Sequence, residues 1–389
     1  MQLIMRGECF YILAGDTSAD LLAAHLMRAI QLDIYMPVNW IGIGGEQMQQ
    51  QGLETSLPMS SLSVIGIIDA ITSYNRLLKI AKNQVAQIMV ARPSAIFTVD
   101  TKQFSLKFAM LLRKEMDKAG WHVPIIQLVA PTVWAWGPWR AKKFEIAFDK
   151  ILCLFPFEPP YFNSEKTDAV FVGHPYGYLS NQSSRQALGN NRKKRSNLIG
   201  LLPGSRRREI ANNLPDILKA AELFSAQFPD CQFILPTTAS LEKDVRRQLN
   251  NHQLEVEIVV GLGAFDNCLL DILAAICVSG TATLQLALHA VPAVTCYKTN
   301  PINFMLMKSF FKLKDPILPN ILLQTEVYSC FLQSKQTSYN LSSALVQIYD
   351  NISLQQSKMK QHAQELQQML IGYEDEFESS IAKAINIRE

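Results

Sequence analysis

Short apolar segments alternate with longer amphipathic segments along this sequence, and this alternation restricts the possible fold more than any other feature. Apolar strands that each lead into a helix are typical of parallel sheets covered by helices, so we predict an α/β protein. In the first half the expected strands are Phe10–Ala14, Trp40–Ile43, Ala95–Val99, Ile125–Val129, Lys150–Leu154 and Val170–Val172. In the second half they are Leu198–Leu202, Gln232–Leu235, Glu257–Val260, Ile276–Val278 and Ala293–Cys296.

A polar, basic stretch, residues 178–197, separates the two series of strands. Its Gly, Asn and Ser content is typical of a linker between domains. We therefore predict a Rossmann-like domain over 1–177, a linker over 178–197 and a second Rossmann-like domain over 198–370. A C-terminal helix over 371–389, set off by a break at Gly372, is free to cross back to the first domain. The helix that follows residue 206 contains Pro215, and we expect it to kink or restart there.

Composition narrows the class of partner. The chain has 389 residues, and its 37 Lys and Arg against 34 Asp and Glu give a net charge of +3, too small to indicate nucleic acid. Its seven cysteines contain no CxxC pair and are interpreted as reduced, and its six histidines lack the spacing of metal ligands. No signal peptide and no run near the ~18 apolar residues of a membrane span is present, so we expect a cytoplasmic protein, at most peripheral on a membrane.

Two loops of the second half have the features of phosphate sites. In LLPGSRRREI, residues 201–210, a strand leads through a Pro-Gly turn into a helix, and Arg206 offers a bidentate guanidinium. In VSGTATLQLAL, residues 278–288, the small residues Ser279, Gly280 and Thr281 leave room for a diphosphate beside backbone donors. A solvated arginine and a capped helix are the plainer alternatives. Together the loops favour a nucleoside-diphosphate site.

Two loops of the first half carry acidic residues after strands. AGDTSAD, residues 14–20, lacks a dinucleotide fingerprint; Asp16, Ser18 and Asp20 offer acceptors to sugar hydroxyls, or Ser18 simply caps the next helix. FTVDTKQF, residues 97–104, places Asp100 at the end of a strand, as a general base or as a structural acid.

Two aromatic motifs of the first half remain. The tryptophans of residues 129–140 either line a sugar or acyl site or serve only in packing. We favour the packing role for at least one of them. For His174, in GHPYG, we favour a hydrogen-bonded structural residue in a hinge turn, with a catalytic group as the alternative.

In this order the motifs resemble those of the lipid-A-disaccharide synthase family. The resemblance covers roughly residues 8–370. The matching segments are AGDTSAD, GIGGEQM, VIGIID, VDTKQF, APTVWAW, LFPFE, VGHP, LLPGSR, SGTATLQ, CYK and LPN.

The resemblance implies a glycosyltransferase of the GT-B type, with its two Rossmann-like domains facing each other across a cleft. The implied donor is UDP-2,3-diacylglucosamine, the acceptor is 2,3-diacylglucosamine 1-phosphate, and the products are a β-1′,6-linked disaccharide phosphate and UDP. It implies an inverting reaction without metal or other cofactor, at the inner face of the cytoplasmic membrane, and leaves a homodimer open. Asp100 then becomes the expected base, with Asp16 the next candidate, and Arg206, residues 279–281, Gln285 and Asn320 are expected at UDP.

The chain departs from the family pattern at several positions. Asp16 and Gln285 each replace a Glu, and Ala19 replaces a Gly, while Lys102 and Gln103 replace Pro and Asp. Glutamine still hydrogen-bonds ribose, but without the charge. These changes keep two alternatives open. One is another GT-B UDP-sugar enzyme, an epimerase or a transferase; the other is a catalytically silent paralogue that binds UDP.

Residues 59–80 contain a dense apolar segment around Val64, Ile65, Ile67 and Ile68, followed by Arg76 and Lys79. Apolar residues flanked by cations suit an anionic bilayer surface, and a core helix is the alternative. We predict a membrane-facing surface here, because both implied substrates carry acyl chains.

Overall fold

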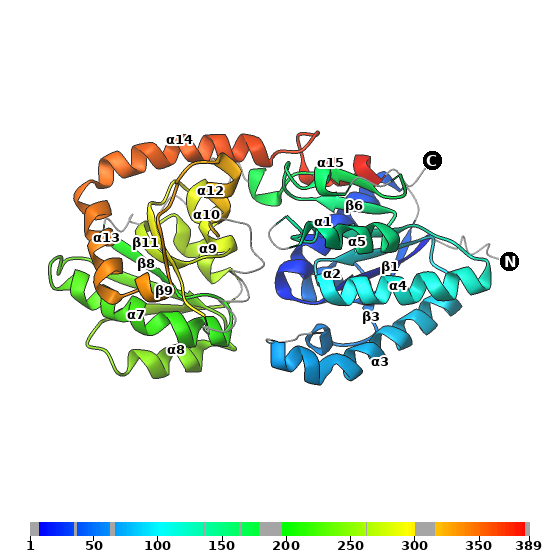
Figure 1. Ribbon diagram of the computed structural model, residues 1–389, viewed down its shortest axis with the longest axis horizontal. Coiled ribbons are helices and arrows are strands. Elements are labelled where there is room, and N and C mark those ends of the chain that lie inside the picture. The colour runs from blue at the N-terminus through cyan, green and yellow to red at the C-terminus, as the bar shows by residue number, and fades with distance from the viewer. Residues whose placement is uncertain are drawn as a thin grey trace. The chain divides into compact units, whose positions relative to one another are not determined.

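The computed structural model describes residues 8–34, 37–62, 67–134, 137–162, 165–178, 197–261, 263–299 and 316–385. The chain divides into two compact units, Met1–Tyr178 together with Leu370–Glu389, and Leu179–Met369 (Figure 1). Each unit contains a parallel sheet covered by helices, as the alternation of apolar and amphipathic segments predicts.

The first unit is built on a seven-stranded sheet in the order β3-β2-β1-β4-β5-β6-β7, and all its neighbouring strands pair in parallel. Its strands are β1 (Glu8–Ala14), β2 (Val38–Ile43), β3 (Leu53–Thr55), β4 (Ala95–Val99), β5 (Ile125–Leu128), β6 (Lys150–Cys153) and β7 (Asp168–Phe171). Its helices are α1 (Thr17–Asp33), α2 (Glu46–Gln50), α3 (Ile67–Ala91), α4 (Lys102–Ala119), α5 (Ala141–Ala147) and α15 (Phe377–Ile385).

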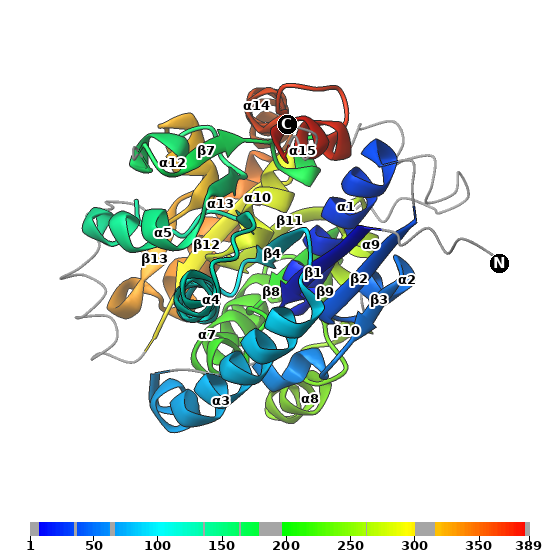
Figure 2. The same ribbon diagram turned by 90° about the vertical axis from the view of Figure 1, so that its right-hand side faces the viewer.

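Helices cover both faces of this sheet (Figure 2), and an apolar layer lies on each face. On one face the side chains of α1 and α15 pack on alternate residues of the strands, with Phe10, Trp40 and Phe97 forming an aromatic cluster. On the other face α3, α4 and α5 pack around Tyr11 and Phe108. Burial on both faces explains why these strands are almost wholly apolar in sequence.

The second unit has a six-stranded parallel sheet in the order β10-β9-β8-β11-β12-β13. Helices α7 and α13 pack together over a core on one face of it, and α9, α10 and α12 follow β10, β11 and β12 along the chain. The strands are β8 (Leu198–Leu202), β9 (Gln232–Thr237), β10 (Val256–Val260), β11 (Ile272–Val278), β12 (Ala293–Tyr297) and β13 (Cys330–Leu332). The helices are α7 (Arg207–Ser225), α8 (Glu242–Leu249), α9 (Ala264–Leu269), α10 (Thr281–Leu288), α12 (Leu318–Leu323), α13 (Ser338–Asp350) and α14 (Ile352–Leu370).

The chain returns to the first unit after the end of α14, at a set of close backbone approaches. The break expected at Gly372 is present, and a Cβ there would lie 2.4 Å from the carbonyl oxygen of Val172, so only glycine fits. The amide of Gly372 donates to Tyr178 Oη over 2.6 Å, and the amide of His174 donates to the carbonyl oxygen of Leu370 over 2.8 Å. Helix α15 then packs on α1.

Several expectations differ from the observed elements; among the strands, β6 ends at Cys153 rather than Leu154, and β7 spans Asp168–Phe171 rather than Val170–Val172. The three-residue edge strands β3 and β13 were not predicted: β3, Leu53–Thr55, contains no apolar run, and β13, Cys330–Leu332, is apolar but short and only partly buried. Val129 does not end β5; its φ of +75° takes it out of the strand. Helix α7 does not restart at Pro215 but continues through it, because its buried face, including Leu214 and Ile217, packs on the sheet along its whole length.

The predicted linker lies outside the described residues, apart from Tyr178 and Asn197. So do residues 63–66 and the side chains of 67–73, which carry the predicted membrane-facing surface. The described part of α3 packs Ala81, Val85 and Ile88 into the core.

Candidate active site

Both sheets have a switch point, where the chain leaves a central strand on one side and returns to the other. In the first unit it lies between β1 and β4, and in the second between β8 and β11. Open α/β sheets bind ligands beyond the carboxyl ends of the two strands at such a point. Asp16 follows β1 and Asp100 follows β4, and the strand ends are level because Ala14 pairs with Val99. The first candidate site is therefore the loop pair that carries Asp16 and Asp100.

The turn that carries Asp100 is strained. Asp100 and Thr101 have φ values of +49° and +36°, and Val129, at the end of the neighbouring strand β5, has a φ of +75°. Left-handed backbone costs of order 1 kcal/mol or more per non-glycine residue, and such residues persist only where the surroundings fix them. Strained residues cluster at functional sites, so the strain indicates that this turn is a candidate for a catalytic role.

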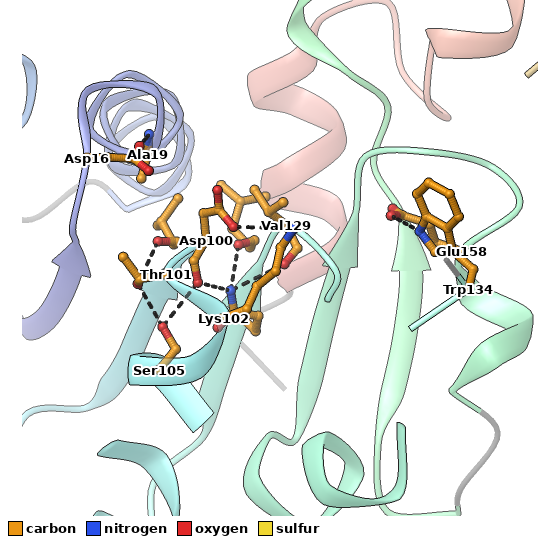
Figure 3. A network of polar contacts seen from close by, with 12 residues as sticks. Asp16, Ala19, Asp100, Thr101, Lys102, Ser105, Val129, Trp134 and Glu158 are labelled. Atoms are coloured by element: carbon orange, nitrogen blue, oxygen red, sulfur yellow. Dashed lines mark hydrogen bonds and ion pairs between the residues drawn. The ribbon is translucent and has the colours of Figure 1, made fainter. Parts of the chain in front are cut away.

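Two buried side chains, those of Gln127 and Ser105, fix the turn. Figure 3 shows Ser105 beside Asp100 and Thr101. Gln127 Nε2 donates to the carbonyl oxygens of Asp100 over 3.1 Å and of Val129 over 3.3 Å. Ser105 Oγ donates to the same oxygen of Asp100 over 3.2 Å and also bonds Thr101 Oγ1 over 2.9 Å. Both residues are fully buried. The backbone of Asp100 is thus held from inside the protein.

The carboxylate of Asp100 remains accessible. Its side chain is 31% exposed, and Lys102 Nζ lies 3.6 Å from Oδ1. Within the described residues Oδ2 accepts no hydrogen bond. An ion pair at this separation and exposure contributes little to stability. Asp100 therefore presents an accessible carboxylate on a turn held by backbone hydrogen bonds, with Lys102 beside it.

Asp16 has a structural task at the start of α1. Its Oδ1 accepts from the amide of Ala19 over 2.9 Å, so the cap of this helix is Asp16 and not Ser18, which is exposed in the first turn. The one bond to Oδ1 leaves the second carboxylate oxygen of Asp16 without a hydrogen bond in the described part of the chain. Asp16 and Ser18 therefore lie at the switch point, and their contact with a ligand stays a prediction.

Asp20 does not have the sugar-binding role expected from the sequence. It is buried and accepts from the backbone amides of Gly45, Gln47 and Met48, over 2.8, 3.0 and 3.2 Å. These are the donors at the start of α2, so the carboxylate caps that helix from another element. A Cβ on Gly45 would lie 2.5 Å from Asp20 Oδ2, which explains the glycine. Asp20 therefore joins two motifs, AGDTSAD and GIGGEQM, rather than facing a substrate.

Sequence reasoning missed Glu158. It is 2% exposed, and its carboxylate accepts from Trp134 Nε1 over 3.2 Å and from the amide of Phe155 over 3.1 Å (Figure 3). Burial raises the pKa of Glu158 to about 7, although these hydrogen bonds and the nearby charge of Lys102 act against the rise. The only signal was its place in LFPFE.

The other aromatic predictions are met in part. The Trp134 ring packs edge-on against Phe157 at 5.1 Å between centroids, as the packing interpretation expects of at least one tryptophan. Trp139 is exposed, and Trp136 lies outside the described residues. His174 is structural: it is buried, its Nδ1 accepts from the amide of Tyr176, and burial lowers its pKa to about 3.

Glu158→Gln is expected to remove a pH dependence of stability. Between about pH 4.5 and 7 the unfolded chain has lost this proton and the folded protein keeps it, so the free energy of unfolding falls as the pH rises through this window. The fall attributable to Glu158 is about 3 kcal/mol. Urea unfolding at several pH values measures it, with Glu115→Gln, at a half-exposed site on α4, as control. Equal slopes in the parent and Glu158→Gln would contradict the assignment.

In the second unit, Arg206 follows β8 and residues 279–281 follow β11, on the two sides of the switch point. Arg206 is the N-cap residue of α7; its side chain is 74% exposed, and Nη1 lies 2.8 Å from Glu209 Oε1. Glu209 Oε2 accepts from the amide of Ser205, and Gly204 has a φ of +104° with no room for a Cβ beside Glu209. The Pro-Gly turn is thus closed by Glu209, and the guanidinium stands at the surface.

The loop before α10 offers backbone donors. Neither Ser279 nor Thr281 caps the helix: Ser279 Oγ donates to the carbonyl oxygen of Pro316 over 3.0 Å, and the N-cap Gly280 has no side chain to accept. The amide of Ser279 donates to the carbonyl oxygen of Cys296 over 2.9 Å. Gly280 and Thr281 are exposed, so within this loop the donors open to an anion are their amides rather than those of Ser279.

Gln285 and Asn320 are both buried and both hydrogen-bonded. Gln285 Nε2 donates to Asp266 Oδ1 over 2.7 Å. Asn320 accepts from the amides of Val327 and Tyr328, each over 3.0 Å, and donates to the carbonyl oxygen of Tyr328 over 2.8 Å. Asn320 therefore holds the turn at 327–328, and a contact with UDP stays a prediction.

The described ranges contain neither a metal-binding cluster nor a membrane-spanning helix. No three His, Cys, Asp or Glu side chains there gather closely enough to hold a metal ion. No described helix has the length and apolarity needed to cross a membrane.

Solved structures share the fold over nearly the whole chain. The glycotransferase of kitacinnamycin is 14% identical with a TM-score of 0.61, covering 98% of both chains. The UDP-GlcNAc 2-epimerase from Neisseria meningitidis, solved with UDP-GlcNAc bound, is 9% identical with a TM-score of 0.58, covering 97% of this chain and 98% of that one. The two parallel sheets thus define a protein of the GT-B fold class, and the predicted fold class is confirmed.

Sequence comparison gives the family. The model described as "Lipid-A-disaccharide synthetase" matches residues 10–385, and the chain belongs to this family. The lipid-A-disaccharide synthase of Rhodospirillum centenum is 30% identical over 358 residues, 91% of this chain and 88% of that relative. That of Chromobacterium violaceum is 32% identical over 351 residues, 87% of each. The predicted resemblance and the enzyme class, a glycosyltransferase, are confirmed by this family.

Proposed function

We propose that the protein transfers 2,3-diacylglucosamine from UDP to the 6-hydroxyl of 2,3-diacylglucosamine 1-phosphate. The products are a β-1′,6-linked disaccharide phosphate and UDP, with inversion at the anomeric carbon. One observation supports this most. The accessible carboxylate of Asp100, on a strained turn, lies at one switch point, and the Arg206 guanidinium and the exposed 280–281 amides lie at the other. The family's name, which refers to a disaccharide product, agrees with it.

The proposed chemistry assigns one task to each unit. Asp100 removes the proton of the acceptor hydroxyl as its oxygen attacks the anomeric carbon. The bond from that carbon to the β-phosphate oxygen breaks, and UDP leaves with the electron pair. Arg206 and the amides of Gly280 and Thr281 stabilise the charge that develops on the diphosphate. Protein groups thus supply every step of this scheme, without a metal ion or another cofactor.

UDP is proposed to bind the second unit, because the Arg206 loop and the 279–281 loop follow β8 and β11 at the carboxyl ends of these strands. Ser279 shapes the loop through its bonds to Pro316 and Cys296, and Gln285 accepts from the ribose. Asn320 supports the same edge by holding the 327–328 turn.

The decisive experiment measures UDP release by the purified protein with both diacylated substrates. Release with formation of the disaccharide phosphate is expected. Release of UDP without a disaccharide, or interconversion of the sugar, would favour another UDP-sugar enzyme. Binding of UDP without turnover would favour a silent paralogue.

Arg206→Ala is expected to weaken UDP binding about 10- to 100-fold, because a charged hydrogen bond contributes about 1.5–3 kcal/mol. Calorimetric titration with UDP measures the loss. Arg247→Ala serves as control, because Arg247 is equally exposed on α8 and pairs with Asp244. Unchanged UDP affinity and turnover in Arg206→Ala would place the diphosphate elsewhere.

Both proposed substrates carry acyl chains, which partition into a membrane. The reaction is therefore proposed to take place at the inner face of the cytoplasmic membrane. Val64, Ile65, Ile67 and Ile68 remain the proposed contact, with Arg76 and Lys79 after them. Co-sedimentation with anionic vesicles tests this, and absence of the protein from the vesicle pellet would refute it.

A further inference from the structure

The pairing of Gln285 with Asp266 determines the orientation of an amide that sequence alone leaves free. Gln285 is 8% exposed on α10, and its Nε2 donates to Oδ1 of Asp266 on α9 over 2.7 Å. An ionised carboxylate only accepts hydrogen bonds, so the amide must present its nitrogen to Asp266. Its carbonyl oxygen, Oε1, then points away from that bond and accepts no hydrogen bond from the described residues. The pair therefore presents an acceptor and keeps it fixed.

The position of this acceptor suits the nucleoside end of a ligand. Gln285 lies four residues after Thr281 on α10, and residues four apart share a helix face. One turn of helix is about 5.4 Å, which is the scale that separates a diphosphate from the ribose it is attached to. Asp266 lies on α9, which follows β10, so its carboxylate reaches Gln285 from a second helix at the carboxyl edge of the same sheet. A diphosphate at Gly280 and Thr281 would place its ribose beside Gln285.

We propose that Asp266 is a positioning residue, which holds the Gln285 amide so that Oε1 accepts hydrogen bonds from the ribose hydroxyls of the nucleotide. The inference rests on the proposed function, because it takes UDP as the ligand. It places the negative charge at residue 266 and a neutral acceptor at residue 285. A glutamate at 285 would therefore weaken UDP binding in this chain, because two carboxylates would face each other across a hydrogen-bond distance.

A charge exchange tests the pair. Gln285→Glu is expected to weaken UDP binding about tenfold, since the two carboxylates repel or one must take up a proton. In Asp266→Asn with Gln285→Glu, the new amide at 266 donates to the new carboxylate at 285, so affinity returns to within about threefold of the parent. Asp266→Asn alone completes the cycle and keeps a partial bond. Calorimetric titration with UDP at pH 8 measures all four proteins, with Glu242→Ala on α8 as a surface control.

A second ligand separates positioning from a structural role. The parent is expected to prefer UDP over 2′,3′-dideoxy-UDP by about 3- to 10-fold, the contribution of a neutral hydrogen bond. In Asp266→Ala the amide is free to turn, so this preference should shrink towards one while the fold persists by circular dichroism. An unchanged preference in Asp266→Ala, or undiminished UDP affinity in Gln285→Glu, would overturn the inference alone. Failure of the unaltered protein to bind UDP would overturn the proposed function, and this inference with it.

Discussion

Replacing Asp100 by asparagine is expected to lower kcat by at least about 100-fold, because a positioned general base contributes about 3–5 kcal/mol to the rate. Asparagine keeps the shape of the side chain and cannot take the acceptor's proton. Steady-state kinetics with both diacylated substrates measure the loss. UDP affinity should not change, since its proposed contacts all lie on the second unit, so the loss should appear in kcat rather than in UDP binding.

The structure indicates that this variant will fold. Asparagine is among the few residues that adopt left-handed backbone readily, so the φ of +49° is retained without new strain. The bonds that fix the turn come from Gln127 and Ser105 to backbone oxygen, and they do not involve the carboxylate. Thermal unfolding close to that of the parent verifies this. Asp117→Asn, at an exposed site near the end of α4, is the matched control for turnover.

Turnover of Asp100→Asn within a few-fold of the parent would move the base elsewhere. Asp16 is then the next candidate, since it lies at the other strand of the same switch point. Asp16→Asn distinguishes the two roles of that residue. Asparagine also caps helices well, so the helix start is preserved and any loss of turnover reports on proton transfer.

The sequence allowed the central strands to be predicted because their signal is local. Leu198–Leu202 is an apolar run ended by a Pro-Gly turn, and β8 has these same bounds. The edge strands β3 and β13 have three residues each and lie half-exposed, so their pairing depends on a neighbour that no local pattern announces. The course of α7 through Pro215 is a similar case, in which packing of the buried face outweighs a local signal.

The candidate site divides in the same way. Strand ends followed by Asp100, by Arg206 and by Ser279 are visible in sequence, and the strand order then places them at two switch points. The strain at Asp100 was not predictable, because it depends on Gln127, 27 residues away in the chain. The same holds for Glu158 and for the partner of Gln285, each a single polar residue whose role is set by tertiary contacts.

Asp20 shows how a tertiary contact changes the meaning of a motif acid, and its replacement is expected to have the largest effect on stability. Asp20→Ala removes a buried carboxylate that accepts from Gly45, Gln47 and Met48. Hydrogen bonds to a charged group contribute about 1.5–3 kcal/mol each, and the amides left behind regain water only in part, so we expect a loss of at least about 3 kcal/mol. Urea unfolding, followed by the transition of the first unit, measures it.

Asp20→Asn is the matched variant. Its remaining oxygen is able to accept from Gly45 and Met48, the two amides that bond Oδ1, whereas the bond from Gln47 to Oδ2 and the charge at the start of α2 are lost. An intermediate loss is therefore expected. Asp20→Ala within about 1 kcal/mol of the parent would show that water replaces the carboxylate, and would reopen Asp20 as a group available to a sugar.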